Sequence, residues 1–119
     1  MAEGTILRPV SFTTNGFTAD DFTAHANLSV DLVKSYWGKL DRFMFIYIEG
    51  SATSNISSWE TLLTMDSKFC PTQTNGAYTI NINGVLYMGN FNSSGVLNTA
   101  QPINSGQYIR FCTTCLTQN

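Results

Sequence analysis

The chain has 119 residues, a net charge of −2 and a pI near 5.0, and 12% of its residues are charged, about half of the ~25% usual in soluble proteins. Its lysines and arginines form no basic cluster, which argues against nucleic-acid binding, because neutralising phosphates requires several grouped cations. Aromatic residues make up 13% of the chain, which is not the composition of a disordered protein and predicts one folded domain over residues 1–119 with a polar, uncharged surface.

Residues 1–27 are predicted to contain an N-terminal strand and a connecting segment. The strand covers residues 5–12 (TILRPVSF), and Pro9 marks it as an edge strand or a bend. Residues 17–26 (FTADDFTAHA) fit a short capped helical turn and an irregular loop equally well. Residues 1–10 lack the apolar run of a signal peptide, so we expect either a protein that is made in a cytoplasm and leaves it by cell lysis or assembly, if at all, or a piece of a longer chain.

Two predicted strands form the centre of the domain. Leu28–Trp37 alternates between apolar and polar residues, which is typical of a half-buried strand, and Leu40–Gly50 (LDRFMFIYIEG) is a central strand closed by its glycine. Gly38 and Lys39 between them predict a two-residue hairpin loop, compatible with a type II′ turn. The central strand is apolar on both faces, with Phe43, Phe45 and Tyr47 on one side and Met44, Ile46 and Ile48 on the other. We expect a second sheet to cover one face and another subunit to cover the other.

The C-terminal half continues with short strands and turns. Residues 59–65 (WETLLTM) are compatible with a short helix or a strand. Asn83–Gly84 separates two alternating segments, Ala77–Asn83 and Val85–Phe91, which is a strong hairpin signal. Gln107–Leu116 is the last predicted strand. Together these segments predict an all-β fold, an antiparallel β-sandwich or jelly roll, with at most one or two short helical turns.

The residues that most often carry metal or nucleophilic chemistry are sparse. Three cysteines cannot all pair within one chain, and the CTTC segment of Cys112 and Cys115 lacks the second CxxC pair of a zinc ribbon. Residues three apart on a strand point to opposite faces, so we expect these two to be plain strand residues. His25 is the only histidine, and we expect it on the surface. We expect no metal and no cofactor.

The acidic residues are the remaining candidates for catalysis. Paired carboxylates hydrolyse glycosidic bonds, and adjacent ones can hold Ca²⁺. No spacing in the sequence supports either role, so we expect solvated charges. The candidates are Asp20, Asp21, Asp31, Glu49, Glu60 and Asp66.

Aromatic residues beside polar loops are candidates for binding a carbohydrate. A pyranose ring has an apolar C–H face that matches an aromatic ring, and polar neighbours can bind its hydroxyl groups. The candidate ligand-binding residues are Trp37, Tyr87, Phe91, Asn90 and Asn92. Trp59 is a further aromatic candidate. Core or interface packing is the simpler expectation for Trp59, Trp37 and Tyr87.

Four segments in order carry a family resemblance over residues 28–116: LDRFMFIYIEG, WETLLTMDSKFCP, YTININGVLYMG and GQYIRFCTTCL. This arrangement resembles the C-terminal head domains of bacteriophage tail-fibre and receptor-binding proteins. The family's usual phrase near the tryptophan segment is closer to LPxGFRP. Residues 65–71 (MDSKFCP) keep its Phe and Pro and lack its first Pro, its Gly and its Arg.

The resemblance implies a trimeric β-sandwich at the tip of a fibre, with residues 28–118 as the core of the head domain. It also implies a virion protein, made in the bacterial cytoplasm, that binds a host-surface glycan without catalysis. Its expected partners are its own copies, host carbohydrate and the rest of the fibre, with no membrane insertion. The expected interface residues are Phe43, Phe45, Tyr47, Tyr108 and Arg110.

Three other functions remain open at this point. The chain can be a structural or trimerisation module of the virion with no host ligand. It can be a tail enzyme that depolymerises a glycan, which requires acidic residues converging in a groove. It can also be a trimeric jelly-roll ligand of the cytokine type, against which the lack of a secretion signal argues weakly.

Overall fold

The computed structural model describes residues 14–118, and the predicted strand over residues 5–12 lies outside them. Nearly all secondary structure in the described part is antiparallel β-sheet, and its only helical element is the 3₁₀ turn η1 (Ser67–Phe69). The predicted all-β, sandwich-like fold is therefore confirmed. The strands are β1 (Thr14–Gly16), β2 (Phe22–Ala24), β3 (Leu28–Val30), β4 (Tyr36–Leu40), β5 (Phe43–Ala52), β6 (Leu63–Met65), β7 (Asn75–Ile82), β8 (Val85–Phe91), β9 (Val96–Thr99) and β10 (Tyr108–Leu116).

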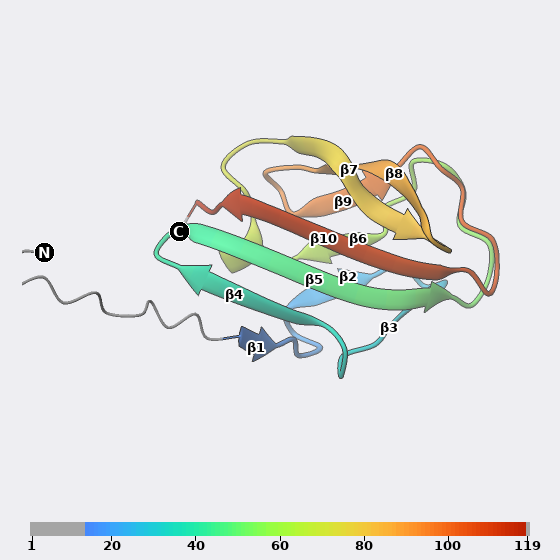
Figure 1. Ribbon diagram of the computed structural model, residues 1–119, viewed down its shortest axis with the longest axis horizontal. Helices are drawn as coiled ribbons and strands as arrows, with labels where there is room; N and C mark the ends of the chain where they lie inside the picture. The colour runs from blue at the N-terminus through green and yellow to red at the C-terminus, as the bar shows by residue number, and fades with distance from the viewer. Residues whose placement is uncertain (1–13, 119) are drawn as a thin grey trace, which may run out of the picture.

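The strands form one curled sheet that folds over a single core. Their order is β1-β4-β5-β10-β7-β8-β9-β6-β2, and β3 pairs with the end of β5. In Figure 1, β4, β5 and β10 form the layer nearest the viewer, and β2, β6 and β9 lie behind them. The curl brings the two ends of the strand order into two packed layers, as in a β-sandwich.

Strand β5 is the centre of the front layer. It pairs with β10 from Phe43 to Ser51 and with both β4 and β3 on its other edge. The apolar run closes at Gly50, and the strand continues beyond it to Ala52. A β-carbon at position 50 would lie 2.5 Å from the backbone oxygen of Ser29, so glycine is what lets β3 approach. The glycine therefore marks a close strand contact, not a strand end.

The predicted strand Leu28–Trp37 is divided into β3 and β4 by a loop over residues 31–35. The Asp31 side chain causes this break, because its Oδ1 accepts hydrogen bonds from the backbone N–H groups of Val33 and Lys34 at 3.0 and 3.2 Å. The backbone N–H of Ser35 also donates to the Asp31 carbonyl oxygen, at 3.1 Å. Backbone groups that a continuous strand would pair with β5 are thus used within the loop.

The β4–β5 hairpin exists, but its predicted turn at Gly38 and Lys39 is wrong. Both residues lie inside β4, and the two-residue loop is Asp41 and Arg42. Asp41 has a φ of 56°, a left-handed conformation that aspartate tolerates better than most residues. The pairing of Leu40 with Phe43 closes the hairpin immediately before this loop.

The predicted Asn83–Gly84 hairpin is confirmed between β7 and β8. Asn83 and Gly84 have φ values of 49° and 90°, as a type I′ turn requires. The predicted alternation along β7 is only partly correct, because a register shift between Tyr78 and Ile80 turns Tyr78 outward. Such a bulge inserts one extra residue into a strand and reverses the faces on either side of it.

The two segments left open by the sequence each contain one short strand. Within residues 17–26 and 59–65, the short strands β2 and β6 pair antiparallel to each other. A helix over residues 59–65 is therefore excluded. Thr18 and Asp21 do bond to each other, since the Thr18 N–H donates to Asp21 Oδ2 at 2.8 Å, but they stabilise a turn.

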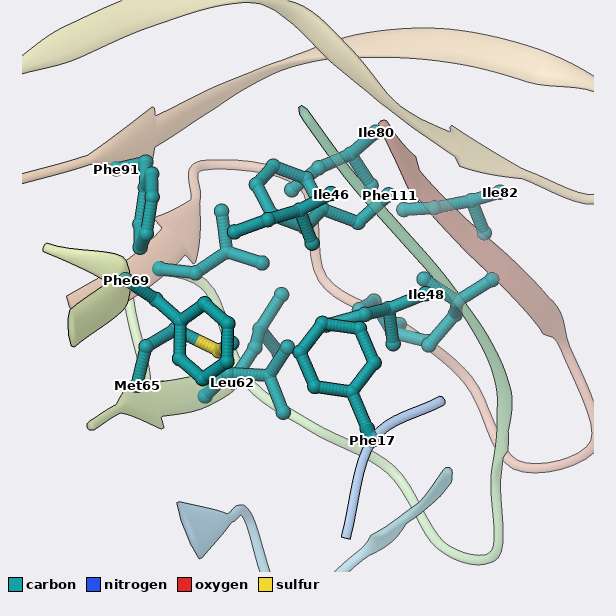
Figure 2. Packing of buried hydrophobic residues seen from close by; sticks show 14 of the residues in the cluster. Phe17, Ile46, Ile48, Leu62, Met65, Phe69, Ile80, Ile82, Phe91 and Phe111 are labelled. Atoms are coloured by element: carbon teal, nitrogen blue, oxygen red, sulfur yellow. The ribbon is translucent and has the colours of Figure 1, made fainter. Parts of the chain in front are cut away.

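The core lies between the two layers. Figure 2 shows the aromatic side chains that fill it: Phe91 and Phe111 meet edge to face with ring centres 5.7 Å apart, and Phe17 lies 5.4 Å from Phe69. The inward face of β5 is fully buried, as its alternation predicted. The buried hydrophobic cluster comprises Phe17, Met44, Ile46, Ile48, Ala52, Ile56, Leu62, Leu63, Met65, Phe69, Ile80, Ile82, Phe91, Leu97, Ile103, Ile109 and Phe111.

Candidate functional site

The outer face of the front layer, which is the side of β4, β5 and β10 turned away from the core, carries exposed apolar side chains. The register places Leu40 and Leu116 on either side of Phe43. These three residues and Tyr36 are between 41% and 55% exposed. A group of large apolar residues gathered on one sheet face is typical of an interaction surface.

Four aromatic residues on this face form what we call the aromatic ridge: Tyr36, Phe43, Phe45 and Tyr47. The ring of Tyr36 lies 5.9 Å from that of Phe45 and 5.1 Å from that of Tyr47. These ring contacts hold Tyr36, Phe45 and Tyr47 in place on the paired strands β4 and β5. The ridge is therefore a preformed surface made of rigid side chains.

A shallow depression, which we call the lateral groove, lies beside the ridge. Strand β7 pairs with β10 only as far as Phe111, and its first half lies away from β10 in Figure 1. Two hollows of about 330 and 300 Å³ lie along this stretch and share Asn75 and Thr114 as lining residues. Asn75 Nδ2 donates a hydrogen bond to Thr113 Oγ1 at 3.1 Å, which links the start of β7 to β10. Cys112 and Thr114 stand directly across from Tyr47 and Phe45, so small side chains adjoin the large ones.

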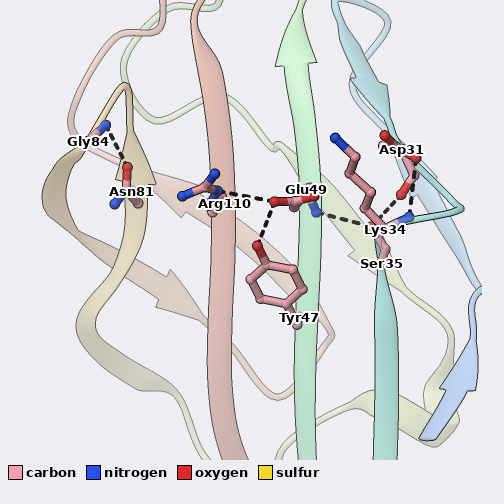
Figure 3. A network of polar contacts seen from close by, with 8 residues as sticks. All are labelled: Asp31, Lys34, Ser35, Tyr47, Glu49, Asn81, Gly84 and Arg110. Carbon is pink, nitrogen blue, oxygen red and sulfur yellow. Dashed lines mark hydrogen bonds and ion pairs between the residues drawn. The ribbon is translucent and has the colours of Figure 1, made fainter.

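A buried carboxylate supports the ridge from one end (Figure 3). The Glu49 side chain is 9% exposed, and its Oε1 accepts hydrogen bonds from the Tyr47 hydroxyl at 2.6 Å and from Arg110 Nε at 3.1 Å. The Glu49 backbone N–H donates to Ser35 Oγ at 3.0 Å, which ties β5 to the loop before β4. The network therefore holds Tyr47 in place within the ridge.

These contacts keep the Glu49 carboxylate ionised. The hydrogen bond from Tyr47 lowers the pKa of Glu49, and Tyr108 and Arg110 add to this effect, so that burial, which acts in the opposite direction, is outweighed. Burial, followed by the bond to Glu49, raises the pKa of Tyr47 to about 12. The outer face thus has a carboxylate and a guanidinium that satisfy each other.

We expect the Glu49→Gln substitution to lower the free energy of unfolding by about 1.5 kcal/mol near neutral pH, the usual contribution of a hydrogen bond to a charged group. The pKa of Glu49 is lower in the folded chain than its usual value of 4.5, so the ionised carboxylate stabilises the fold at pH values above 4.5. This stabilisation is lost as the pH falls through the lowered pKa. The difference in the free energy of unfolding between the wild-type chain and Glu49→Gln should therefore become smaller at acidic pH. Urea unfolding at a series of pH values and one protein concentration measures it, and a difference independent of pH would contradict this account.

The five residues predicted at a subunit interface lie together on the outer face. Phe43, Phe45 and Tyr47 belong to β5, and Tyr108 and Arg110 to β10. The Arg110 guanidinium carbon lies 5.2 Å from the centre of the Tyr108 ring. Sequence reasoning missed other members of this face, namely Tyr36, Leu40, Glu49 and Leu116. The alternation of β4 would have indicated Tyr36 and Leu40 if the hairpin turn had been placed at Asp41.

The predicted carbohydrate-binding residues do not form one site. Phe91 is 1% exposed and belongs to the core, so its proposed role in stacking on a sugar is wrong. Trp37 lies within β4 and packs edge-on against Phe69 at 5.0 Å, half-buried, because the turn lies farther along the chain. Tyr87 is half-buried against the core. Asn90 is also half-buried, on β8.

Asn92 has a structural role in the loop between β8 and β9. Its Oδ1 accepts hydrogen bonds from the backbone N–H groups of Ser94 and Val96, at 2.9 and 3.0 Å. This is the Asx-turn behaviour that makes asparagine frequent in tight loops. The residue is thus engaged by its own backbone neighbours.

Most of the acidic candidates also make local contacts. Asp21 forms an ion pair with Lys68 at 2.9 Å, and Asp66 Oδ2 accepts a weak hydrogen bond from the Lys68 backbone N–H at 3.4 Å. Asp31 and Glu49 act in the contacts described above, and Glu60 bonds to His25 at 3.2 Å. Each of these carboxylates therefore has a neighbour that accounts for its position.

The cysteines are free thiols. Cys112 is exposed and Cys115 half-buried, three positions apart on β10, as the strand interpretation of the CTTC segment expected. Cys70 is buried, and burial raises the pKa of both Cys70 and Cys115. A raised pKa disfavours the reactive thiolate.

No protein-family model matches this chain, and a search of curated proteins found no match either. Within residues 14–118, no helix has the length and apolar character needed to cross a membrane. The geometry of the outer face is therefore the main basis for a functional proposal.

Proposed function

We propose that this chain is a non-catalytic head domain of a phage tail fibre, which assembles as a homotrimer through its outer face and binds a host-surface carbohydrate. The observation that carries the proposal is the aromatic ridge on a well-paired sheet, where Tyr36 and Phe43 are exposed together with Leu40 and Leu116. Aromatic residues on rigid elements are the usual anchors of protein interfaces. The resemblance to fibre heads supplies the trimeric state and the ligand class.

A second copy of the chain is the partner that suits this face. The ridge is uncharged, and the one buried carboxylate beside it, Glu49, is already neutralised by Arg110. Covering the ridge therefore leaves the Glu49 carboxylate paired, and an unpaired buried charge is the main cost of burying such a surface. The large ridge lies next to the lateral groove, whose walls are small neutral residues such as Thr114.

The arrangement of ridge and groove favours a ring over a two-fold dimer. If the ridge of one copy enters the lateral groove of the next, each copy uses two different surfaces, which is a heterologous contact. Heterologous contacts close into rings when the rotation between copies permits it. Three copies around the axis of a fibre are the simplest such ring, and the virion tail is then the place where the protein acts.

The ligand class is tested by applying the purified chain to an array of bacterial cell-wall and capsular polysaccharides. The proposal predicts retention on at least one polysaccharide, with no release of reducing ends during prolonged incubation. An assembled ring that binds none of them would favour a purely structural virion module. Release of reducing ends that disappears in an Asp or Glu variant would favour a depolymerase.

A further inference from the structure

The expected core packing of Trp59 is wrong, because this residue is exposed, and it lies in an unusual backbone conformation. Its φ is 66°, in the left-handed region that bulky residues rarely adopt, and the residue is 57% exposed. Glycine or asparagine would hold this turn with less strain. Strained backbone positions are concentrated at ligand-binding sites, so an exposed tryptophan here calls for an explanation other than folding.

The turn that carries Trp59 is firmly held on both sides. Glu60 Oε2 accepts the Ser57 backbone N–H at 2.6 Å, and the Trp59 backbone N–H donates to the Thr99 carbonyl at the end of β9, at 2.9 Å. The Ser58 hydroxyl also donates to the Ala100 carbonyl. The indole is therefore displayed from a fixed backbone.

A polar acceptor stands at the next position in the turn. His25 Nδ1 accepts the Asn27 backbone N–H at 2.9 Å, so in the neutral ring Nε2 carries the proton and donates to Glu60 Oε1 at 3.2 Å. The Ser57 N–H, and then His25, lower the pKa of Glu60, which keeps the carboxylate ionised. The Glu60 side chain is 45% exposed, and each oxygen retains a lone pair for a further donor.

We propose that Trp59 and Glu60 form a saccharide-binding site, in which a pyranose ring stacks on the indole and one of its hydroxyl groups donates to the Glu60 carboxylate. This inference rests on the proposed carbohydrate-binding function and gives it a location. An exposed apolar ring at one position of the turn and an anionic acceptor at the next match a sugar with one C–H face and neighbouring hydroxyls. An anionic ligand would be repelled by Glu60, and a protein partner would need more apolar area than this turn offers, since Ile56 and Leu62 beside it are buried.

The site is tested by saturation-transfer NMR with the methyl glycosides of glucose, galactose, N-acetylglucosamine and rhamnose. We expect transfer to at least one glycoside, and binding about tenfold weaker or more in Trp59→Ala, the usual effect of truncating a tryptophan at the centre of a contact. Tyr78→Ala, which removes another exposed aromatic ring, is the matched control and should bind normally. Glu60→Gln should weaken binding less than Trp59→Ala.

A second variant separates the ligand role from folding. Trp59→Gly relieves the left-handed strain, so it should unfold at a higher temperature than the wild-type chain and still lose binding. Transfer that is unchanged in both Trp59 variants, or absent for all four glycosides, would overturn the site. If the wild-type chain and Trp59→Ala are retained equally on the polysaccharide array, the proposed function stands and the site lies elsewhere.

Discussion

Replacing Phe43 with aspartate is expected to convert the assembled particle into single chains. Phe43 is 47% exposed in the isolated chain, so aspartate can be solvated there and the fold should lose little stability. At an interface the same carboxylate would be buried against the aromatic and aliphatic side chains of a neighbour without a partner charge, which strongly opposes association. Light scattering coupled to size exclusion measures the change, from about three times 13.1 kDa to about 13.1 kDa.

A matched control variant is Val33→Asp. Val33 is 96% exposed on the loop between β3 and β4, so this change adds the same charge to an apolar position outside the ridge. It should leave the mass unaltered. If Phe43→Asp has the mass of the wild-type particle, the ridge is not the interface. Circular dichroism of both variants verifies that their β-structure is intact.

The Phe111→Ala substitution is expected to lower the free energy of unfolding by about 3–5 kcal/mol, the range measured for removing a buried phenylalanine side chain. Phe111 is 2% exposed, pairs with Ile80 and Ile48 on the neighbouring strands and meets Phe91 edge to face. Because small domains are stable by only about 5–15 kcal/mol, this loss is a large part of the total. Urea unfolding followed by circular dichroism measures it.

The experiment is cleanest in the Phe43→Asp background, since the stability of an oligomer depends on protein concentration. Leu116→Ala on the same strand is the comparison, because Leu116 faces outward and is 55% exposed. It should cost about 1 kcal/mol or less. Equal losses in the two variants would contradict the assignment of inner and outer faces on β10.

Much of the fold follows from local sequence rules. The β7–β8 hairpin was predictable because asparagine and glycine are the residues that adopt the two left-handed positions of a type I′ turn. The central strand was predictable because an apolar run with β-forming residues has few other uses in a chain of this size. The last strand, β10, alternates as expected, with Ile109 and Phe111 buried.

Other features depended on contacts between distant segments. The predicted strand is divided at Asp31 because the side chain of this residue accepts hydrogen bonds from two backbone N–H groups. The sequence alone does not distinguish such an aspartate from one on the edge of a continuous strand. The role of Gly50 requires knowing that Ser29 passes within contact distance. Local periodicity contains neither fact.

The same limits apply to the sites. The outer face was found because β5 is apolar on both sides and only one side can meet the core of the same chain. Phe91 was wrongly predicted to bind a ligand. Gly89 and Phe91 lie two positions apart on β8 and therefore share the face that packs inward, and the alternation of the strand indicated this. The lateral groove was not predictable, because it exists only where β7 leaves β10 beyond Phe111. The backbone conformation of Trp59 likewise has no sequence signature.

The measurement that tests the central claim most directly is the mass of the wild-type chain in solution, determined by light scattering coupled to size exclusion. Self-association through the outer face predicts a value of about three times 13.1 kDa that persists on dilution. A value of about 13.1 kDa at all concentrations would contradict it, because the aromatic ridge would then remain exposed to water in the functional protein.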